Sequence, residues 1–101
     1  EGAEITENKK PDSYQTEFIV KLKDKCKVKY LDIAEAIAEG QKVESFKIHS
    51  KTDDGIWNFE EHGTTIGSRK VVVLDDVETS ELKIQITSAR DEVKMDWIKV
   101  Y

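Results

Sequence analysis

The sequence predicts an all-β domain, an antiparallel β-sandwich of about seven strands. Short segments in which apolar and polar residues alternate recur along the chain, and turn-forming residues separate them every eight to twelve positions or so. Alternation with a period of two is typical of strands that bury one face. The chain has no internal repeat and no long segment with a helical period, so a sandwich or barrel is the fold class that this pattern favours.

The predicted domain begins at residue 16. Residues 1–15 are polar, contain the only proline and show no apolar period, so we expect a flexible leader or the remnant of a linker. Thr16–Leu22 alternates and predicts a half-buried strand. Asp24 and Lys25 predict a turn, after which a second strand runs over Lys27–Ile33.

The middle of the chain predicts a loop and then a hairpin. Residues 34–40 have high helix propensity but are too few for an independent helix, so we expect a crossover loop with at most one helical turn. The strands Val43–Lys51 and Ile56–Glu61 follow. Asp54 and Gly55 between them favour a turn, because glycine accepts a positive φ without steric cost.

A second turn is predicted between Gly63 and Gly67, and no phosphate-loop pattern follows it. Three further strands complete the set: Lys70–Leu74, Glu81–Thr87 and Val93–Tyr101. The first of these is almost continuously β-branched, which favours a strand covered on both faces and ended by Asp75 and Asp76. The residues expected to share the interior are apolar and alternate along their strands: Phe18, Val20, Val71, Leu82, Ile84 and Ile86.

Composition narrows the range of partners. A chain of 101 residues is the size of one domain. Sixteen basic against twenty-one acidic residues give a net charge of −5, which argues against nucleic acid and against anionic membrane surfaces. No apolar run approaches the roughly twenty residues that span a bilayer. No signal peptide is present and the chain opens at Glu1 without an initiator Met, so we expect a processed or excised piece. Neutral sugars remain compatible with this charge.

The residues that commonly hold metals are few. Cys26 is the only cysteine, so it forms no internal disulfide, and we expect a buried, unreactive thiol at a strand start. One cysteine and two separated histidines, His49 and His62, do not make a zinc pattern, and no dense Asp/Asn loop offers the oxygen ligands of calcium. We therefore expect no metal and no cofactor.

Several motifs together carry a family resemblance. They are Glu35-Ala36-Ile37 with Gly40–Phe46, Asp54–Trp57, Gly63–Lys70, Ser88-Ala89-Arg90 and the ending Ile98–Tyr101. In this order and spacing they resemble the C-terminal β-sandwich of family 29 glycoside hydrolases, the α-L-fucosidases. That module belongs to the galactose-binding-like group, which includes discoidin and family 32 carbohydrate-binding domains. Two departures are a missing stretch before the first strand and the absence of the usual proline after Arg90.

The resemblance implies a jelly-roll topology, with the start of the family fold absent and Glu35 and Ile37 folded back onto the sandwich. It also implies a non-catalytic accessory module that packs on the catalytic barrel of a larger hydrolase, with glycans as a second possible partner. The alternatives are a free-standing galactose-type carbohydrate-binding module and a ligand-free protein-interaction domain. The expected compartment is extracellular or periplasmic, and the expected state is a monomer.

Three residues are the candidates for carbohydrate binding: His62, Arg90 and Trp97. Sugar sites combine an aromatic platform with polar side chains from loops. Trp97 is the possible platform, because alternation turns it away from Ile98 and Val100, although a core position is an equal alternative. Trp57 is expected in the core, and Arg69 is expected to tie its turn to a neighbouring element. Most carboxylates fall in turns or on outward positions, so no catalytic pair is predicted.

Overall fold

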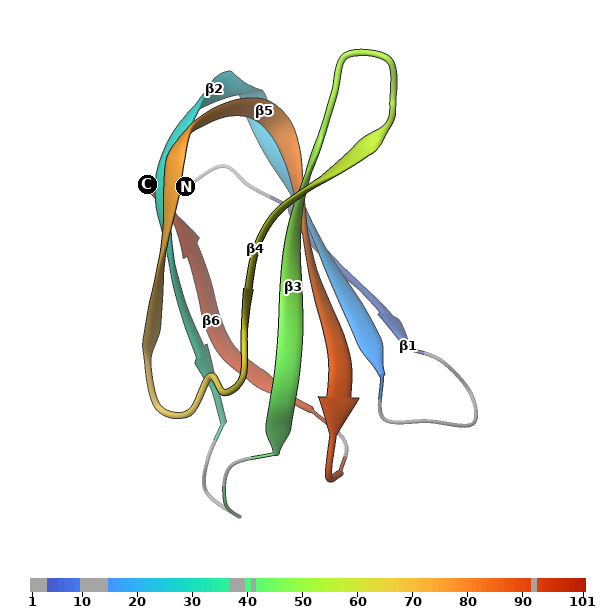
Figure 1. Ribbon diagram of the computed structural model, residues 1–101, viewed down its shortest axis with the longest axis vertical. Helices are drawn as coiled ribbons and strands as arrows, with labels where there is room; N and C mark the ends of the chain where they lie inside the picture. Colours follow the sequence, from blue (N-terminus) through green and yellow to red (C-terminus); the bar gives the residue numbers. More distant parts are fainter. Residues whose placement is uncertain (1–3, 10–14, 37–39, 41, 92) are drawn as a thin grey trace.

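The computed structural model describes residues 4–9, 15–36, 40, 42–91 and 93–101 and contains six strands (Figure 1). The strands are β1 (Glu4–Lys9), β2 (Thr16–Glu35), β3 (Val43–Lys51), β4 (Trp57–Gly63), β5 (Lys70–Ala89) and β6 (Met95–Val100). All pairings are antiparallel. The all-β prediction is confirmed, with fewer and longer strands than the sequence indicates.

Two 20-residue strands, β2 and β5, run through both layers of the sandwich. They pair with each other on both sides of a bend at one end of the molecule (Figure 1). The first half of β2 and the second half of β5 lie in a large layer with the order β1-β2-β5-β3-β4. The second half of β2 and the first half of β5 form a small layer with β6. The sandwich is therefore one sheet folded over on itself.

An irregularity in the β2–β5 pairing marks the bend. Lys21 lies opposite Glu81 and Cys26 opposite Thr79, so residues 22–25 of β2 face a single residue of β5. Extra residues on one strand increase its local bending and twist. The predicted turn at Asp24 and Lys25 is thus wrong, because the chain bulges there without reversing. The prediction that Cys26 is buried is also wrong. Cys26 is exposed, because it lies at the bend and outside the interior between the two layers.

A second irregularity lies between Val28 and Tyr30 on β2, opposite residues 74–76 of β5. Asp76 adopts a φ of 46° there, a left-handed conformation that aspartate tolerates better than most residues. The predicted strand end at Asp75 and Asp76 is therefore wrong, and β5 continues through both residues. These two continuations reduce the predicted number of strands.

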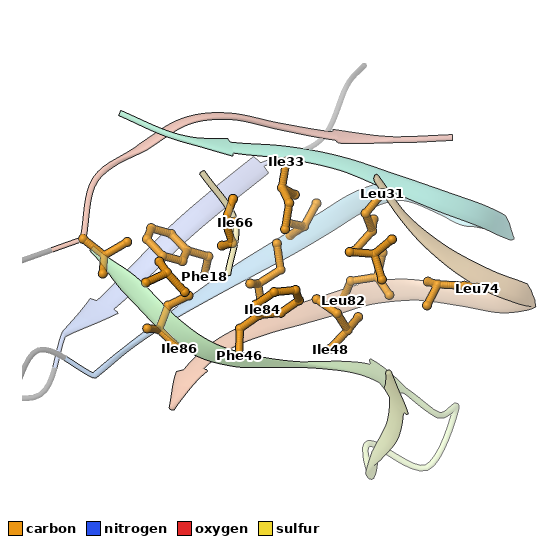
Figure 2. Close-up of a cluster of buried hydrophobic side chains, with 14 of the residues drawn as sticks. Phe18, Leu31, Ile33, Phe46, Ile48, Ile66, Leu74, Leu82, Ile84 and Ile86 are labelled. Carbon is orange, nitrogen blue, oxygen red and sulfur yellow. The ribbon is translucent and has the colours of Figure 1, made fainter. Parts of the chain in front are cut away.

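The core lies between the two layers, and Figure 2 shows part of it. Its members are apolar side chains no more than 6% exposed, among them Phe18, Val20, Leu31, Ile33, Phe46, Ile48, Ile66, Val72, Leu74, Leu82, Ile84 and Ile86. The alternation of β5 places Val72 and Leu74 inward, so Val71, which the sequence assigns to the interior, is 43% exposed on the opposite face. The other five predicted core residues are buried as expected.

The N-terminal segment differs from the predicted leader. Glu4–Lys9 form β1, an edge strand that pairs with Thr16–Lys21 of β2. Residues 1–3 and 10–14 lie outside the described residues. The turn at Asp54 and Gly55 is confirmed, since Gly55 has a φ of 83° and its N–H donates to the Thr52 carbonyl at 2.9 Å. The helical turn expected within residues 34–40 falls on residues 37–39, outside the described residues.

The Glu35 carboxylate binds the backbone of two loops at the end of the sandwich opposite the bend. Its side chain is 1% exposed. Oε1 accepts backbone N–H bonds from Lys42 at 2.8 Å and Val43 at 3.3 Å, while Oε2 accepts one from Gly67 at 2.9 Å. The Glu35 N–H in turn donates to the Gly67 carbonyl at 2.9 Å. A carboxylate at the end of β2 thus fixes both the start of β3 and the loop before β5, and Glu35 folds back as the resemblance implies.

Candidate functional site

The outer surface of the small layer is the candidate site. Leu31 and Ile33 point into the core, so alternation turns Tyr30 and Asp32 outward. Seven large hydrophobic residues of the described chain are exposed, and four of them lie on this surface: Tyr30 (37%), Val71 (43%), Tyr101 (51%) and Val73 (70%). We call these four residues, together with Asp32, Arg69, Trp97 and Lys99, the apolar face.

A nearly buried carboxylate lies at the centre of the apolar face. The Asp32 side chain is 8% exposed, and its oxygens accept hydrogen bonds from Arg69 Nη2 at 2.9 Å, Arg69 Nε at 3.2 Å and Trp97 Nε1 at 3.0 Å. The hydrogen bond from Trp97 and then those from Arg69 lower the pKa of Asp32 below its ordinary value of 3.8. Asp32 is therefore ionised at neutral pH, and it orients both the guanidinium and the indole.

Aromatic rings extend this network along β2 and β6. The rings of Tyr30 and Tyr101 stack with centroids 4.8 Å apart, and the Lys99 ammonium lies 5.3 Å from the Trp97 ring centroid. Backbone bonds hold the Tyr pair, since the Tyr101 N–H donates to the Tyr30 carbonyl at 3.0 Å. The predicted orientation of Trp97, away from Ile98 and Val100, is confirmed by the packing of these two residues against the core.

The valines of the apolar face lie on a sheet edge. Among the described residues, the first half of β5 pairs with β2 alone, because β3 pairs only with the second half. The sequence predicts a strand covered on both faces here, and the structure covers only the face that carries Val72 and Leu74. An exposed apolar edge strand favours association with another surface.

The three predicted carbohydrate-binding residues lie on different elements. Trp97 is half-buried on β6, opposite Ala34 of the small layer. His62 is exposed on β4, opposite Lys47 of the large layer. Arg90 is exposed just after β5, and its N–H donates to the Lys42 carbonyl at 2.9 Å. The structure thus does not gather the three residues around one point, and their role in sugar binding stays a prediction.

Sequence reasoning missed Asp32 as the centre of the site. It sits between two core residues, Leu31 and Ile33, and period-two alternation alone places it on the same side as Tyr30. An acidic residue inside the otherwise apolar run of residues 30–34 is the signal that could have identified it. The role predicted for Arg69, tying its turn to a neighbour, is confirmed by the Asp32 pair.

The outer surface of the large layer is differently built. Trp57 is half-buried there instead of in the core, with Lys83 Nζ 4.8 Å and Lys51 Nζ 5.6 Å from its ring centroid. His49 packs edge-on against Phe59 at 5.9 Å, and its Nδ1 is buried without a hydrogen-bond partner. Burial, and then the nearby Lys83 and Lys47 charges, lower the pKa of His49. The His62 ring stacks on Phe59 at 6.1 Å.

A pocket of about 350 Å³ opens between β1 and β6, at the side of the sandwich. Its lining includes Ile5 and Glu7 of β1, Phe18 of β2, and Met95, Trp97 and Ile98. Trp97 is therefore shared by the pocket and the apolar face. A predicted sugar-binding residue thus lies in the lining of a pocket.

Within the described residues, no three His, Cys, Asp or Glu side chains are close enough together to hold a metal ion. In the same part of the chain, no helix has the length and apolarity needed to cross a membrane. Most of the carboxylates predicted in turns are exposed, as expected, and Glu92 lies outside the described residues.

Comparison with known proteins places this fold. No protein-family model matches the chain. Alpha-L-fucosidase 1 of Arabidopsis thaliana is 32% identical over 95 residues, which are 90% of this chain and 19% of that protein. A putative alpha-L-fucosidase from Bacteroides ovatus superposes with a TM-score of 0.82 at 26% identity, over 99% of this chain and 16% of the other. The family 32 carbohydrate-binding module of C. perfringens NanJ, solved with galactose, superposes with a TM-score of 0.75 at 20% identity, over 89% and 69%.

The coverage figures define what has been matched. This chain spans about a fifth of the curated relative, so the likeness concerns one domain-sized part of a longer protein. The carbohydrate-binding module shares the fold, and at 20% identity the likeness extends no further than the fold. The antiparallel β-sandwich predicted from the sequence is confirmed, and the chain is homologous to a β-sandwich module of the α-L-fucosidases.

Proposed function

We propose that this chain is a non-catalytic accessory β-sandwich module of an α-L-fucosidase-like glycoside hydrolase, where it packs on the catalytic domain. The single observation that supports this most is the match of nearly the whole chain to a small part of each enzyme. It aligns over 98–99% of its length with fucosidases at 26–27% identity while covering 16–19% of them. A module of this kind leaves the reacting carboxylates to the rest of the enzyme. An extracellular or periplasmic parent is part of the proposal.

The test is to isolate the native gene product with an antibody raised against this chain. We expect a polypeptide several times longer than 101 residues that hydrolyses an aryl α-L-fucoside, while the chain alone shows no turnover. A native product of 101 residues, or a longer one without fucosidase activity, would contradict the proposal. Turnover by the chain alone would contradict its non-catalytic role.

A second candidate function is a galactose-type carbohydrate-binding module. The likeness to the module solved with galactose favours it, together with the pocket that Trp97 lines between β1 and β6. Hydroxyl groups of a sugar would be held by polar side chains around such a pocket. Titration of the chain with fucose, galactose and galactosyl oligosaccharides, followed by amide NMR shifts, separates this function from the first.

The expected shifts for a sugar-binding role lie around Trp97, His62 or Arg90, and Trp97→Ala, His62→Ala and Arg90→Ala show which residue matters. Because these residues lie on different elements, shifts confined to one of them would locate the site. A titration without shifts at millimolar sugar would remove this candidate and leave packing or a ligand-free interaction role.

A further inference from the structure

We infer that the apolar face of the small layer is the surface by which the module docks on the catalytic domain of its parent hydrolase. The matching surface of that domain would be apolar, with carboxylates facing Arg69 and Lys99. This inference rests on the proposed function and adds to it the face and the chemistry of the partner.

The exposure of its apolar side chains favours this face as the docking surface. Val73 is 70% exposed, and Tyr101 and Val71 are about half exposed, next to one another in the register of β6, β2 and β5. A group of exposed apolar side chains of this kind marks an interaction surface more often than a solvated one. The strand half that carries Val71 and Val73 is also a sheet edge, because no strand of the described chain other than β2 pairs with it.

The residue types of the apolar face also favour a docking surface. Trp, Tyr and Arg dominate the binding energy at interfaces, and the apolar face carries Trp97, Tyr30, Tyr101 and Arg69. Asp32 already holds the indole and the guanidinium, while 63% of the Arg69 side chain remains exposed. Groups fixed before association lose less conformational entropy on binding, so this network prepares the face for a partner.

Charge distinguishes the catalytic domain from a second copy of this chain. The chain carries a net charge of −5, but on the apolar face Arg69 and Lys99 outnumber the paired Asp32. In a symmetric dimer through this face, the same cations would approach each other, and like charges in an interface disfavour the pairing. A partner with carboxylates has no such penalty.

The length of the matched fucosidases favours a domain of the same polypeptide as the partner. The part that this chain matches is 16–19% of the fucosidase chains at 26–27% identity, so more than four-fifths of each lies outside it. Within one polypeptide, a covalently linked domain is present at a high effective concentration and needs little intrinsic affinity. The outer surface of the large layer offers a weaker candidate, because ion pairs and cation–π contacts already engage its lysines and Trp57. Phe59 is exposed there, but without the group of exposed apolar neighbours that the small layer has.

Hydroxyl-radical footprinting of the full-length hydrolase and of this chain alone tests the inference. We expect oxidation of Tyr30 and Tyr101 to fall at least about threefold in the full-length protein. Phe59, which is 53% exposed on the large layer, is the matched internal control and keeps its reactivity. Protection of Phe59 with Tyr30 and Tyr101 still reactive would overturn the inference while leaving the accessory role intact.

A pair of variants gives an independent readout. Val73→Glu introduces a charge on the apolar face, and Ile56→Glu does so at a 60% exposed position in the β3–β4 turn. Both side chains are exposed, so we expect both variants of the isolated chain to fold like the wild type. In the full-length hydrolase, only Val73→Glu is expected to lower the melting temperature and to speed proteolytic release of the module.

Equal behaviour of the two variants in the full-length hydrolase would contradict the assigned face. A dimer of the isolated chain that Val73→Glu abolishes, without protection of Tyr30 in the hydrolase, would assign the face to a second copy and overturn the inference. A native product with no catalytic domain would instead refute the proposed function itself, so the two failures are distinguishable.

Discussion

The two layers of the sandwich share one interior but differ in their outer surfaces. On the large layer, Lys51 pairs with Glu81 at 3.3 Å, Lys83 lies 4.0 Å from Glu17, and both lysines lie over the Trp57 ring. On the small layer, valine and tyrosine side chains are exposed around one nearly buried ion pair. The large layer thus carries ion pairs and cation–π contacts among its own residues, with Phe59 exposed beside them, whereas the small layer exposes a group of four large apolar side chains.

The contrast between the two outer surfaces indicates which of them is available for an interaction. An antiparallel sheet with one solvated face normally alternates apolar and polar residues. The second half of β5 follows that rule, with Lys83 and Gln85 opposite to Leu82, Ile84 and Ile86, and the first half breaks it with Val71 and Val73. The departure from alternation coincides with the exposed face.

The largest expected effect tests the shared interior. Ile84 of the large layer and Ile33 of the small layer are both fully buried. We expect Ile84→Ala and Ile33→Ala each to lower the free energy of unfolding by about 2–5 kcal/mol, from lost burial and the cavity left behind. Urea unfolding of the two variants measures this. A cost below about 1 kcal/mol for either one would mean that its layer is peripheral to the core.

The next effect tests the connection between the layers. Glu35→Ala leaves the N–H groups of Lys42, Val43 and Gly67 without their acceptor, and we expect a loss of about 2–4 kcal/mol. Glu35→Gln keeps one acceptor oxygen and is expected to cost less. Glu78→Ala at an exposed position is the control and is expected to stay within about 0.5 kcal/mol of the wild type. Equal free energies of unfolding for Glu35→Ala and the control would show that the carboxylate does not stabilise the two loops.

A smaller expected effect is the pH dependence of stability that His49 gives to the large layer. Folding lowers the pKa of His49 below its ordinary value of 6.5, which means that the folded state favours the neutral ring. The stability that the neutral ring contributes is therefore complete above pH 6.5 and is lost as the pH falls through the lower, folded pKa. We expect His49→Gln to reduce the loss of stability between pH 7.5 and the acid side of this window. Chemical denaturation at several pH values checks it, and an unchanged pH profile in the variant would contradict it.

The smallest effect at neutral pH concerns the apolar face. The Asp32 carboxylate stabilises the fold above its ordinary pKa of 3.8, and this contribution disappears as pH falls through the lowered, folded value. Trp97→Phe removes the indole donor and is expected to raise the pKa of Asp32 toward the ordinary value. Carboxyl NMR titration measures this directly. An unaltered titration of Asp32 would mean that Arg69 alone sets its pKa.

The sequence predicted the strand segments other than β1 and most of the core, but not the two places where predicted strands continue into one another. Leu82, Ile84 and Ile86 alternate clearly, so burial follows from periodicity. Asp24 and Asp76 also have turn-forming character, yet they lie in bulges of continuous strands, because pairing between β2 and β5 overrides local preference. Local sequence cannot distinguish a chain reversal from a bulge, and this explains the excess of predicted strands.

The candidate site was predictable in part. The outward direction of Trp97 follows from its neighbours Ile98 and Val100. Its partner Asp32 depends on the register between β2 and β6, which pairs residues sixty or more positions apart and is not encoded in either strand alone. The exposure of Val71 was mispredicted because a continuous apolar strand normally has cover on both sides.

The two long bent strands also constrain how this chain reaches its native state. The residues that pair between β2 and β5 are roughly forty to seventy positions apart in the sequence, so large loops must close before either layer gains its contacts. A high contact order of this kind predicts folding in milliseconds to seconds. Because the same two strands belong to both layers, neither layer forms an independent foldon, and we expect their amide hydrogens to exchange through a single cooperative opening.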